Sequence, residues 1–264
     1  MKVLFIGDIV GNVGRKALKE NLPYLKSKYK PHVVIVNGEN AAAGRGITGA
    51  IANEFFNWGV HGITLGNHTW DNKDIFDFID DEPRMIRPAN FPPGTPGRGY
   101  TVVKGEGKEL AIVNLQGRTF LPALDCPFRV ADEIVDELRQ DHKCILVDMH
   151  AEATSEKIAM GWHLDGRASL VVGTHTHVQS NDDRILPGGT AYLTDAGMVG
   201  PRDGILGMER EAVLRKFYTQ LPVRFVVDDG KWHFHGVFVE IDEATGAATR
   251  IEKIRLTEDE WRME

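Results

Sequence analysis

The sequence predicts an α/β fold, and three observations support that class. Short apolar runs of strand length recur along the chain, helix-like stretches lie between many of them, and no linker is long enough to force two domains apart. The 264 residues are 42% hydrophobic, which leaves ample side chains for a core. We expect one domain over residues 1–264, with room for a small hairpin or loop subdomain around 85–130.

The predicted strands are apolar runs that read as buried on both faces: 3–6, 33–36, 62–65, 110–114, 144–148 and 169–172. The predicted helices are 15–29 (interrupted by Pro23), 48–58, 72–80, 128–140 and 156–163. Because strands and helices alternate, they predict right-handed β-α-β units and a largely parallel or mixed sheet covered by helices on both faces.

Two regions depart from this alternation. Residues 88–99 are rich in proline and glycine and predict an irregular surface loop, and a KGEGK turn after it predicts a β-hairpin between YTVV and ELAIV. Near the C-terminus, PVRFVVDDGKWHFHGVFVEID predicts a second hairpin that turns at Asp228-Asp229-Gly230, and RIEKIRL predicts a further strand.

Composition limits the classes of partner. A net charge of -7 and a sequence pI of about 5.8 argue against tight binding of long nucleic acid, whereas a small anionic substrate can bind if a metal supplies positive charge. Cys126 and Cys144 lie in unlike settings and predict two buried free thiols in a reducing compartment. The chain shows neither a signal-peptide layout nor an apolar run of about 18 residues, so we expect a cytoplasmic protein without a membrane partner.

Polar side chains follow five of the predicted strands at the point where each strand ends. In open α/β sheets that edge is where ligands bind. The donors are oxygen and nitrogen atoms without thiolates, which favours Mn, Fe or Zn over a calcium site. The residues are Asp8, Glu39, Asn40, Asn67, His68, His150, His175 and His177.

Each of these residues has a structural alternative when it is taken alone: a helix-capping carboxylate, a turn pair, a loop or core histidine. His175 and His177 are harder to explain in this way, because in an extended loop both imidazoles would lean to one side. Five coincidences at one edge of one sheet favour a shared metal site. The glycines at 7, 11 and 14 do not match a nucleotide-binding loop.

The order Gly-Asp, Gly-Glu-Asn, Gly-Asn-His, a strand-borne His and Gly-Thr-His-Thr-His resembles the calcineurin-like metallophosphoesterases over residues 7 to 177. Two departures stand out: Val10 occupies the place of a metal-binding His, and Glu39 replaces the usual Asp. With GENAAAGRGIT and GNHTWD, they resemble the YmdB-type branch, whose members act as 2′,3′-cyclic nucleotide phosphodiesterases. The resemblance implies a metallophosphoesterase-like sandwich of mixed β-sheets flanked by helices, with a dinuclear metal site at the C-terminal strand ends.

The resemblance also implies a ligand set for two divalent metal ions per chain, with Fe or Mn favoured and Zn allowed. Asp8, Glu39, Asn40 and His177 would hold the first ion. Glu39, Asn67, His150 and His175 would hold the second, with Glu39 bridging. A hydroxide between two cations about 3.5–4 Å apart would attack the phosphorus. His68 would protonate the departing ribose oxygen as general acid.

Several alternatives stay open from the sequence. The leading function is a phosphodiesterase on small cyclic nucleotides such as 2′,3′-cAMP; a phosphomonoesterase or nuclease on the same scaffold, or a regulatory metal-binding protein with incidental turnover, are the others. Asp71 either orients His68 or caps the helix at 72–80, and Arg45 is a weaker candidate for substrate contact. His233 and His235 share one strand face and are interpreted as structural or surface residues. A small phosphodiester is the expected partner, and a homo-oligomer is compatible with the sequence.

Overall fold

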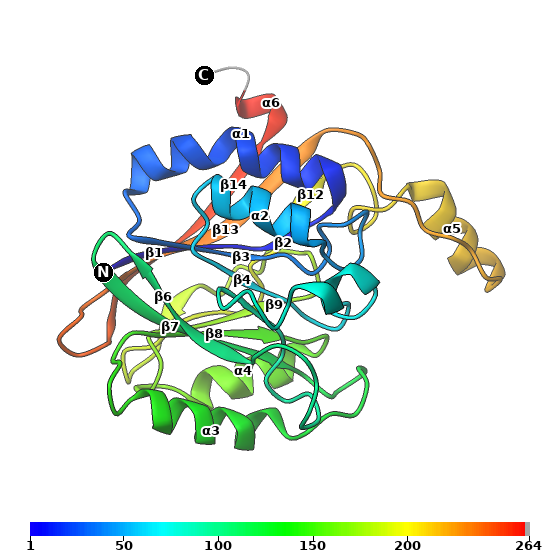
Figure 1. The fold of residues 1–264 in the computed structure, drawn as a ribbon. Helices are drawn as coiled ribbons and strands as arrows, with labels where there is room; N and C mark the ends of the chain where they lie inside the picture. The colour runs from blue at the N-terminus through cyan, green and yellow to red at the C-terminus, as the bar shows by residue number, and fades with distance from the viewer. Residues whose placement is uncertain (262–264) are drawn as a thin grey trace.

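Two β-sheets face each other and carry helices on their outer faces, so that the described residues, 1–261, form four layers in this computed structural model (Figure 1). The helices α1 (Gly11–Tyr29) and α2 (Gly49–Asn57) cover the first sheet, and α3 (Pro127–Leu138) and α4 (Thr154–His163) cover the second. This arrangement confirms the predicted α/β sandwich of mixed sheets flanked by helices.

The first sheet joins segments from both ends of the chain. Its strands lie in the order β2 (Asp8–Ile9), β12 (Met198–Pro201), β13 (Trp232–Ile241), β1 (Lys2–Ile6), β3 (Val33–Asn37), β4 (Gly62–Thr64) and β5 (Met85–Ile86), and β14 (Ala248–Thr257) pairs with β13. Strands β1, β3, β4 and β5 are parallel, whereas β13 runs antiparallel to β1, β12 and β14.

The second sheet comes from the middle of the chain. Its order is β10 (Arg184–Ile185), β11 (Ala191–Leu193), β9 (Leu170–Thr174), β8 (Ile145–His150), β7 (Lys108–Gln116) and β6 (Tyr100–Gly105). The four inner strands are parallel, and β6 and β10 pair antiparallel at the edges. The predicted YTVV–ELAIV hairpin is confirmed as β6–β7.

Three apolar layers hold the sandwich together. One lies between the first sheet and its helices and includes Leu18 and Phe55, one lies between the sheets and includes Phe5 and Leu146, and the third lies under α3 and α4 and includes Val147. Strands buried on both faces must be apolar throughout, which explains the continuous runs in the sequence.

The predicted C-terminal hairpin is wrong in its first half. Residues 222–227 form no strand; β13 instead turns back into β14, and Gly246 N donates to Asp242 O at 2.7 Å within that turn. The physical reason is that β13 is an interior strand with β1, β12 and β14 as partners, so the apolar 222–227 segment has no free edge of β13 to pair with. The predicted RIEKIRL strand is confirmed within β14.

Helix boundaries differ in smaller ways. The stretch expected at 72–80 is only the 3-10 helix η1 (Lys73–Asp77), and its N-cap is Asn72, whose side chain accepts from Asp74 N. Helix α5 (Arg210–Thr219) was not foreseen because only Val213 of it is buried, and short α6 (Glu258–Trp261) follows β14. Cys126 and Cys144 are free thiols, as predicted; Cys144 is buried, whereas the prediction of burial is wrong for Cys126, which is only partly buried. No helix within residues 1–261 combines the length and apolarity needed to cross a membrane.

Candidate metal centre

The candidate residues lie together where parallel strands of both sheets end. Asp8 begins β2 directly after β1, Glu39 and Asn40 follow β3, and Asn67 and His68 follow β4. From the second sheet, His150 is the last residue of β8, and His175 and His177 follow β9. The polar residues at the strand ends of the two facing sheets therefore lie in one place, as expected for the sheet edge at which ligands bind.

Close approach of backbone makes this convergence possible at two glycines. A Cβ at Gly66 would lie 2.4 Å from both Glu39 Oε2 and His150 Nε2, so a side chain there would displace both groups. A Cβ at Gly7 would lie 2.0 Å from Gly197 O. The Gly7-Asp8 turn thus serves to bring Asp8 to the site rather than to cradle a phosphate.

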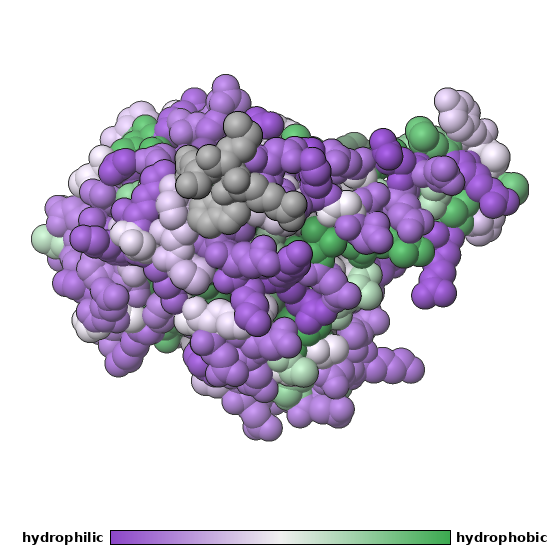
Figure 2. Space-filling model, turned by 90° about the horizontal axis from the view of Figure 1, so that it is seen from above, coloured by the Kyte–Doolittle hydropathy of each residue, from purple (hydrophilic) through white to green (hydrophobic). Residues whose placement is uncertain are grey.

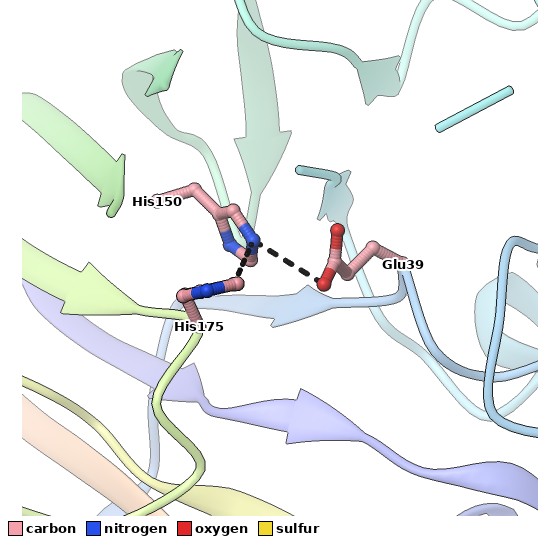
Figure 3. A group of neighbouring side chains, drawn as sticks. All are labelled: Glu39, His150 and His175. Carbon is pink, nitrogen blue, oxygen red and sulfur yellow. Dashed lines mark hydrogen bonds and ion pairs between the residues drawn. The ribbon is translucent and has the colours of Figure 1, made fainter. Parts of the chain in front are cut away.

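Glu39, His150 and His175 form the tightest cluster (Figure 3). The ligand atoms of the three residues lie within 4.8 Å of one another. Nε2 of His150 is 3.2 Å from Glu39 Oε1 and 3.1 Å from His175 Nδ1. Asn67 joins this cluster, since its Oδ1 lies 2.9 Å from the same His150 nitrogen.

Asp8, Asn40 and His177 form a second group, which contacts Glu39 through Asn40. Nε2 of His177 is 3.1 Å from Asn40 Nδ2 and 3.9 Å from Asp8 Oδ1. Nδ1 of His177 lies 3.1 Å from Leu206 O; a proton donated along that contact leaves Nε2 with a free lone pair. Asp8 Oδ1 is buried and has no hydrogen-bond partner among the described residues, so this acceptor is available to bind a cation.

Asn40 presents its amide in an unexpected direction. Its Nδ2 is 3.0 Å from Glu39 Oε1, and its Oδ1 is 2.8 Å from His68 Nδ1. Because only the oxygen can bind a metal, a cation beside Glu39 and His177 would require the Asn40 amide to turn over. The side chain is in reach of that position.

The electrostatics of the site suit cations. Burial, with Glu39 and two further carboxylates nearby, raises the pKa of Asp8 well above its usual range, although His150 opposes this. Burial also acts to raise the pKa of Glu39, but His150 and His68 outweigh it and hold that pKa well below its usual range.

The histidines divide into two kinds. Burial, helped by His150, lowers the pKa of His175 to about 3, and burial also lowers the pKa of His177. Both rings are therefore neutral near pH 7, which is the form that binds metals. Burial acts to lower the pKa of His150, but Glu39 and Asp8 raise it to about 9. A cation in place of that proton fits a nitrogen that faces two carboxylates, and with the orphaned Asp8 Oδ1 the donor set fits divalent metal ions.

A buried chain of polar groups fixes the His150 ring. Nδ1 of His150 lies 2.9 Å from Thr174 Oγ1, which donates to Asp148 Oδ1 at 2.7 Å. The other oxygen of Asp148 accepts from Asn37 Nδ2 and Thr64 Oγ1. Such partners set the orientation of a ligating imidazole. The sequence did not single out these four residues, because they belong to the apolar strands β3, β4, β8 and β9 themselves.

The 174–177 loop is not extended, so the expected reason for pairing His175 with His177 is wrong. Both residues have left-handed backbones, with φ of 98° and 64°. Asp195 holds the loop between them, accepting from Thr176 N at 3.1 Å and Thr176 Oγ1 at 2.7 Å. Lys157 Nζ donates to the same carboxylate at 2.6 Å, and this ion pair is buried.

His68 lies at the mouth of the site with its side chain a quarter exposed. Its Nδ1 faces Asn40 Oδ1 and is 3.4 Å from Glu39 Oε1. Asp71 does neither of the things considered for it: its carboxylate faces Arg45 at 3.5 Å, and Asn72 caps η1. Asn40 and Glu39, rather than Asp71, orient His68.

Glu152 and Val10 are two further neighbours of the candidate site. Glu152, two residues past the end of β8, places Oε2 3.0 Å from His175 Nε2; the strand-end rule that found His150 could have found it as well. Val10 is fully buried, and a Cβ at Gly207 would lie 3.0 Å from its Cγ1. Val10 therefore packs toward the 205–208 turn beside the site.

Comparison with known proteins gives consistent matches over nearly the whole chain. Residues 4–254 match the family described as YmdB-like protein. The chain is 60% identical over 259 residues, covering 98% of both proteins, to a Bacillus subtilis (strain 168) protein named 2′,3′-cyclic-nucleotide 2′-phosphodiesterase.

Solved structures are also similar to this chain. A protein from Mycoplasma pneumoniae described as a novel phosphatase superposes with a TM-score of 0.91 at 37% identity, covering 97% of this chain and 93% of that one. The calcineurin-like phosphoesterase YfkN from Bacillus subtilis shares the fold alone, with a TM-score of 0.61 at 10% identity over 97% of this chain and 90% of that one.

Proposed function

The chain belongs to the YmdB-like family, and from that membership and the geometry of the strand ends we propose that it is a metal-dependent phosphodiesterase that hydrolyses 2′,3′-cyclic nucleotides. The relative from Bacillus subtilis supports the substrate class, because it shares 60% of its residues with this chain and carries that activity in its name.

One observation carries the proposal. Oε1 of Glu39 lies 3.2 Å from His150 Nε2 and 3.0 Å from Asn40 Nδ2, so a single carboxylate oxygen contacts a residue of each group of candidate ligands. This position supports a bridging role for Glu39 between two metal ions. Asp8, Asn40 and His177 would complete one site, and Asn67, His150 and His175 the other.

Two divalent ions bound there would hold the phosphate and lower the pKa of the attacking water. The oxygen-rich donors around Asp8 support Fe or Mn as the native metals. The protein's own part is positioning. Thr174 and Asp148 orient His150, Asp195 orients the loop with His175 and His177, and Gly66 lets Glu39 approach both groups.

His68 is proposed to move the proton. Glu39 Oε1 lies 3.4 Å from its Nδ1, which leaves Nε2 as the nitrogen that can deliver a proton into the cavity. In the reaction, a water gives up one proton to solvent and its oxygen forms a bond to phosphorus, the bond from phosphorus to one ribose oxygen breaks, and that oxygen takes the proton from His68, which solvent then reprotonates. The product is a nucleoside 2′- or 3′-monophosphate, in which the released ribose oxygen is a hydroxyl.

A substrate panel tests the proposal. The metal-loaded protein is assayed on 2′,3′-cAMP, 3′,5′-cAMP, 3′-AMP and a short single-stranded RNA, with and without EDTA. We expect hydrolysis of 2′,3′-cAMP that EDTA abolishes, with much lower rates on the other three. Preference for 3′-AMP or for RNA would instead support a phosphomonoesterase or a nuclease, and undiminished turnover in EDTA would reject metal dependence.

A further inference from the structure

A cavity of about 350 Å³ joins the metal centre to an apolar wall. The candidate metal and acid residues Glu39, His68, His175 and His177 form one side of it. The other side belongs to residues 205–226, here called the arm, through Ile205, Leu206, Met208, Val213, Phe217 and Phe225. In Figure 1 the arm carries α5 away from the sandwich.

The arm is fixed to the metal centre at its base. His177 Nδ1 bonds Leu206 O, so a candidate ligand and the first turn of the arm are in direct contact. The segments that enter and leave α5 are also bonded to each other, since Glu209 N donates to Val226 O at 2.9 Å. Val10 also packs beside Gly207. The distance between the wall and the metal centre is therefore set by the fold.

The apolar side chains of the arm are unusually open to solvent. Of the twelve large hydrophobic side chains exposed in the described residues, seven lie between Leu206 and Val226. Figure 2 shows hydrophobic residues over the projecting arm. Exposed apolar surface gathered beside a polar site marks a place where something binds.

The helical repeat of α5 separates two apolar faces. Val213, Lys216 and Phe217 are three and four residues apart and line the cavity. Leu214 and Tyr218 are also four apart, are 45% and 83% exposed, and do not line it. Phe217 is 69% exposed although it borders the cavity, so a face of its ring is free to accept a ligand.

We infer that the arm binds the nucleobase of the substrate. The base lies against Phe217 and Phe225 while the phosphate of the same substrate occupies the metal centre. This inference rests on the proposed function. A cyclic nucleotide has an anionic phosphate and a flat aromatic base joined by one sugar, and the cavity has the same division, with the candidate metal ligands and His68 at one end and the two aromatic rings at the other. Stacking accepts every base, so we expect little discrimination among the four nucleotides.

The test compares a substrate with a base and one without: 2′,3′-cAMP and methyl riboside 2′,3′-cyclic phosphate, both hydrolysed by the metal-loaded protein. Phe217→Ala should lower kcat/KM for 2′,3′-cAMP about tenfold, the size of one base–aromatic stack, and leave the base-free substrate within about twofold. Tyr218→Ala, the matched control on the other face of α5, should change neither. The native mass of each variant is measured alongside.

A binding measurement separates the inference from the proposed function. Fluorescence of 2-aminopurine riboside 3′-phosphate should be quenched by the wild-type protein and should show about tenfold weaker binding to Phe217→Ala. If the wild type hydrolyses neither substrate, the proposed function fails and this binding result alone decides the base site. Equal losses on both substrates, no loss on either, or losses that follow a change in native mass would overturn the inference; the last would identify the arm as a contact between copies of the chain.

Discussion

Replacing Lys157 by Met tests how the loop that carries His175 and His177 is held. Lys157 and Asp195 form an ion pair at 2.6 Å with side-chain exposures of 1% and 2%. Removing the ammonium leaves a buried carboxylate that keeps only neutral donors, among them Thr176 N and Gly197 N. Breaking a buried pair on one side costs about 3–5 kcal/mol, and the remaining donors place the expected loss near the lower end, about 3 kcal/mol.

For a chain of this size, that loss corresponds to a Tm lower by roughly 6–12 °C. Scanning calorimetry measures it, and elemental analysis of the same sample should show reduced metal content because the loop loses its anchor. The matched control is Lys104→Met: Lys104 and Glu109 are also 2.6 Å apart, but their side chains are 75% and 43% exposed, so its cost should stay below about 1 kcal/mol. Equal costs for the two variants would refute the reasoning.

The remaining predictions concern the site and its surroundings. His68→Ala should keep its metal by elemental analysis and lose about 10²–10⁴-fold in kcat; an unchanged kcat would reject the proposed acid. Asn40→Ala should lose metal from one of the two sites, and a full complement with full activity would contradict its role. Glu152→Gln should weaken metal binding about tenfold in a competition titration, because Glu152 orients the His175 ring. Burial lowers the pKa of His235 to about 3, so the unfolded chain binds the extra proton below pH 6.5 and stability falls as pH falls from there toward 3. His235→Phe should flatten this acid limb in urea titrations at pH 4 to 7, and an unchanged slope would assign it to other groups.

Much of the sandwich could be predicted because its strands are buried on both faces. Runs such as 33–36 and 144–148 are apolar throughout, and the residues that follow them are polar because the strand ends there at a site. For the same reason, the strand ends predicted that His150 and Glu39 lie in one site, although the sequence alone does not place their two sheets face to face. The site could be predicted from the place of each polar residue at the end of a strand, and not from a regular spacing of these residues along the sequence.

What the sequence could not supply depends on partners that are distant along the chain. The 222–227 segment has the pattern of a strand, but β13 has no free edge for it, and this depends on β1 and β14. The bent loop at His175 and His177 depends on Asp195, some twenty residues away, and on Lys157 beneath it. Helix α5 has almost no buried face, so its sequence lacks the helical periodicity of hydrophobic residues from which a helix is predicted.

Metal content measured on the purified protein and on Glu39→Gln tests the central claim most directly. Glu39 is fully buried between both groups of donors, so its replacement should affect both metal positions together. Elemental analysis should find two transition-metal ions per wild-type chain and one or fewer in Glu39→Gln, while Glu54→Gln, a change in an exposed carboxylate, keeps both. A wild-type chain that carries no metal and still hydrolyses 2′,3′-cAMP in EDTA, or a Glu39→Gln chain that retains both ions, would contradict a metal centre bridged by Glu39.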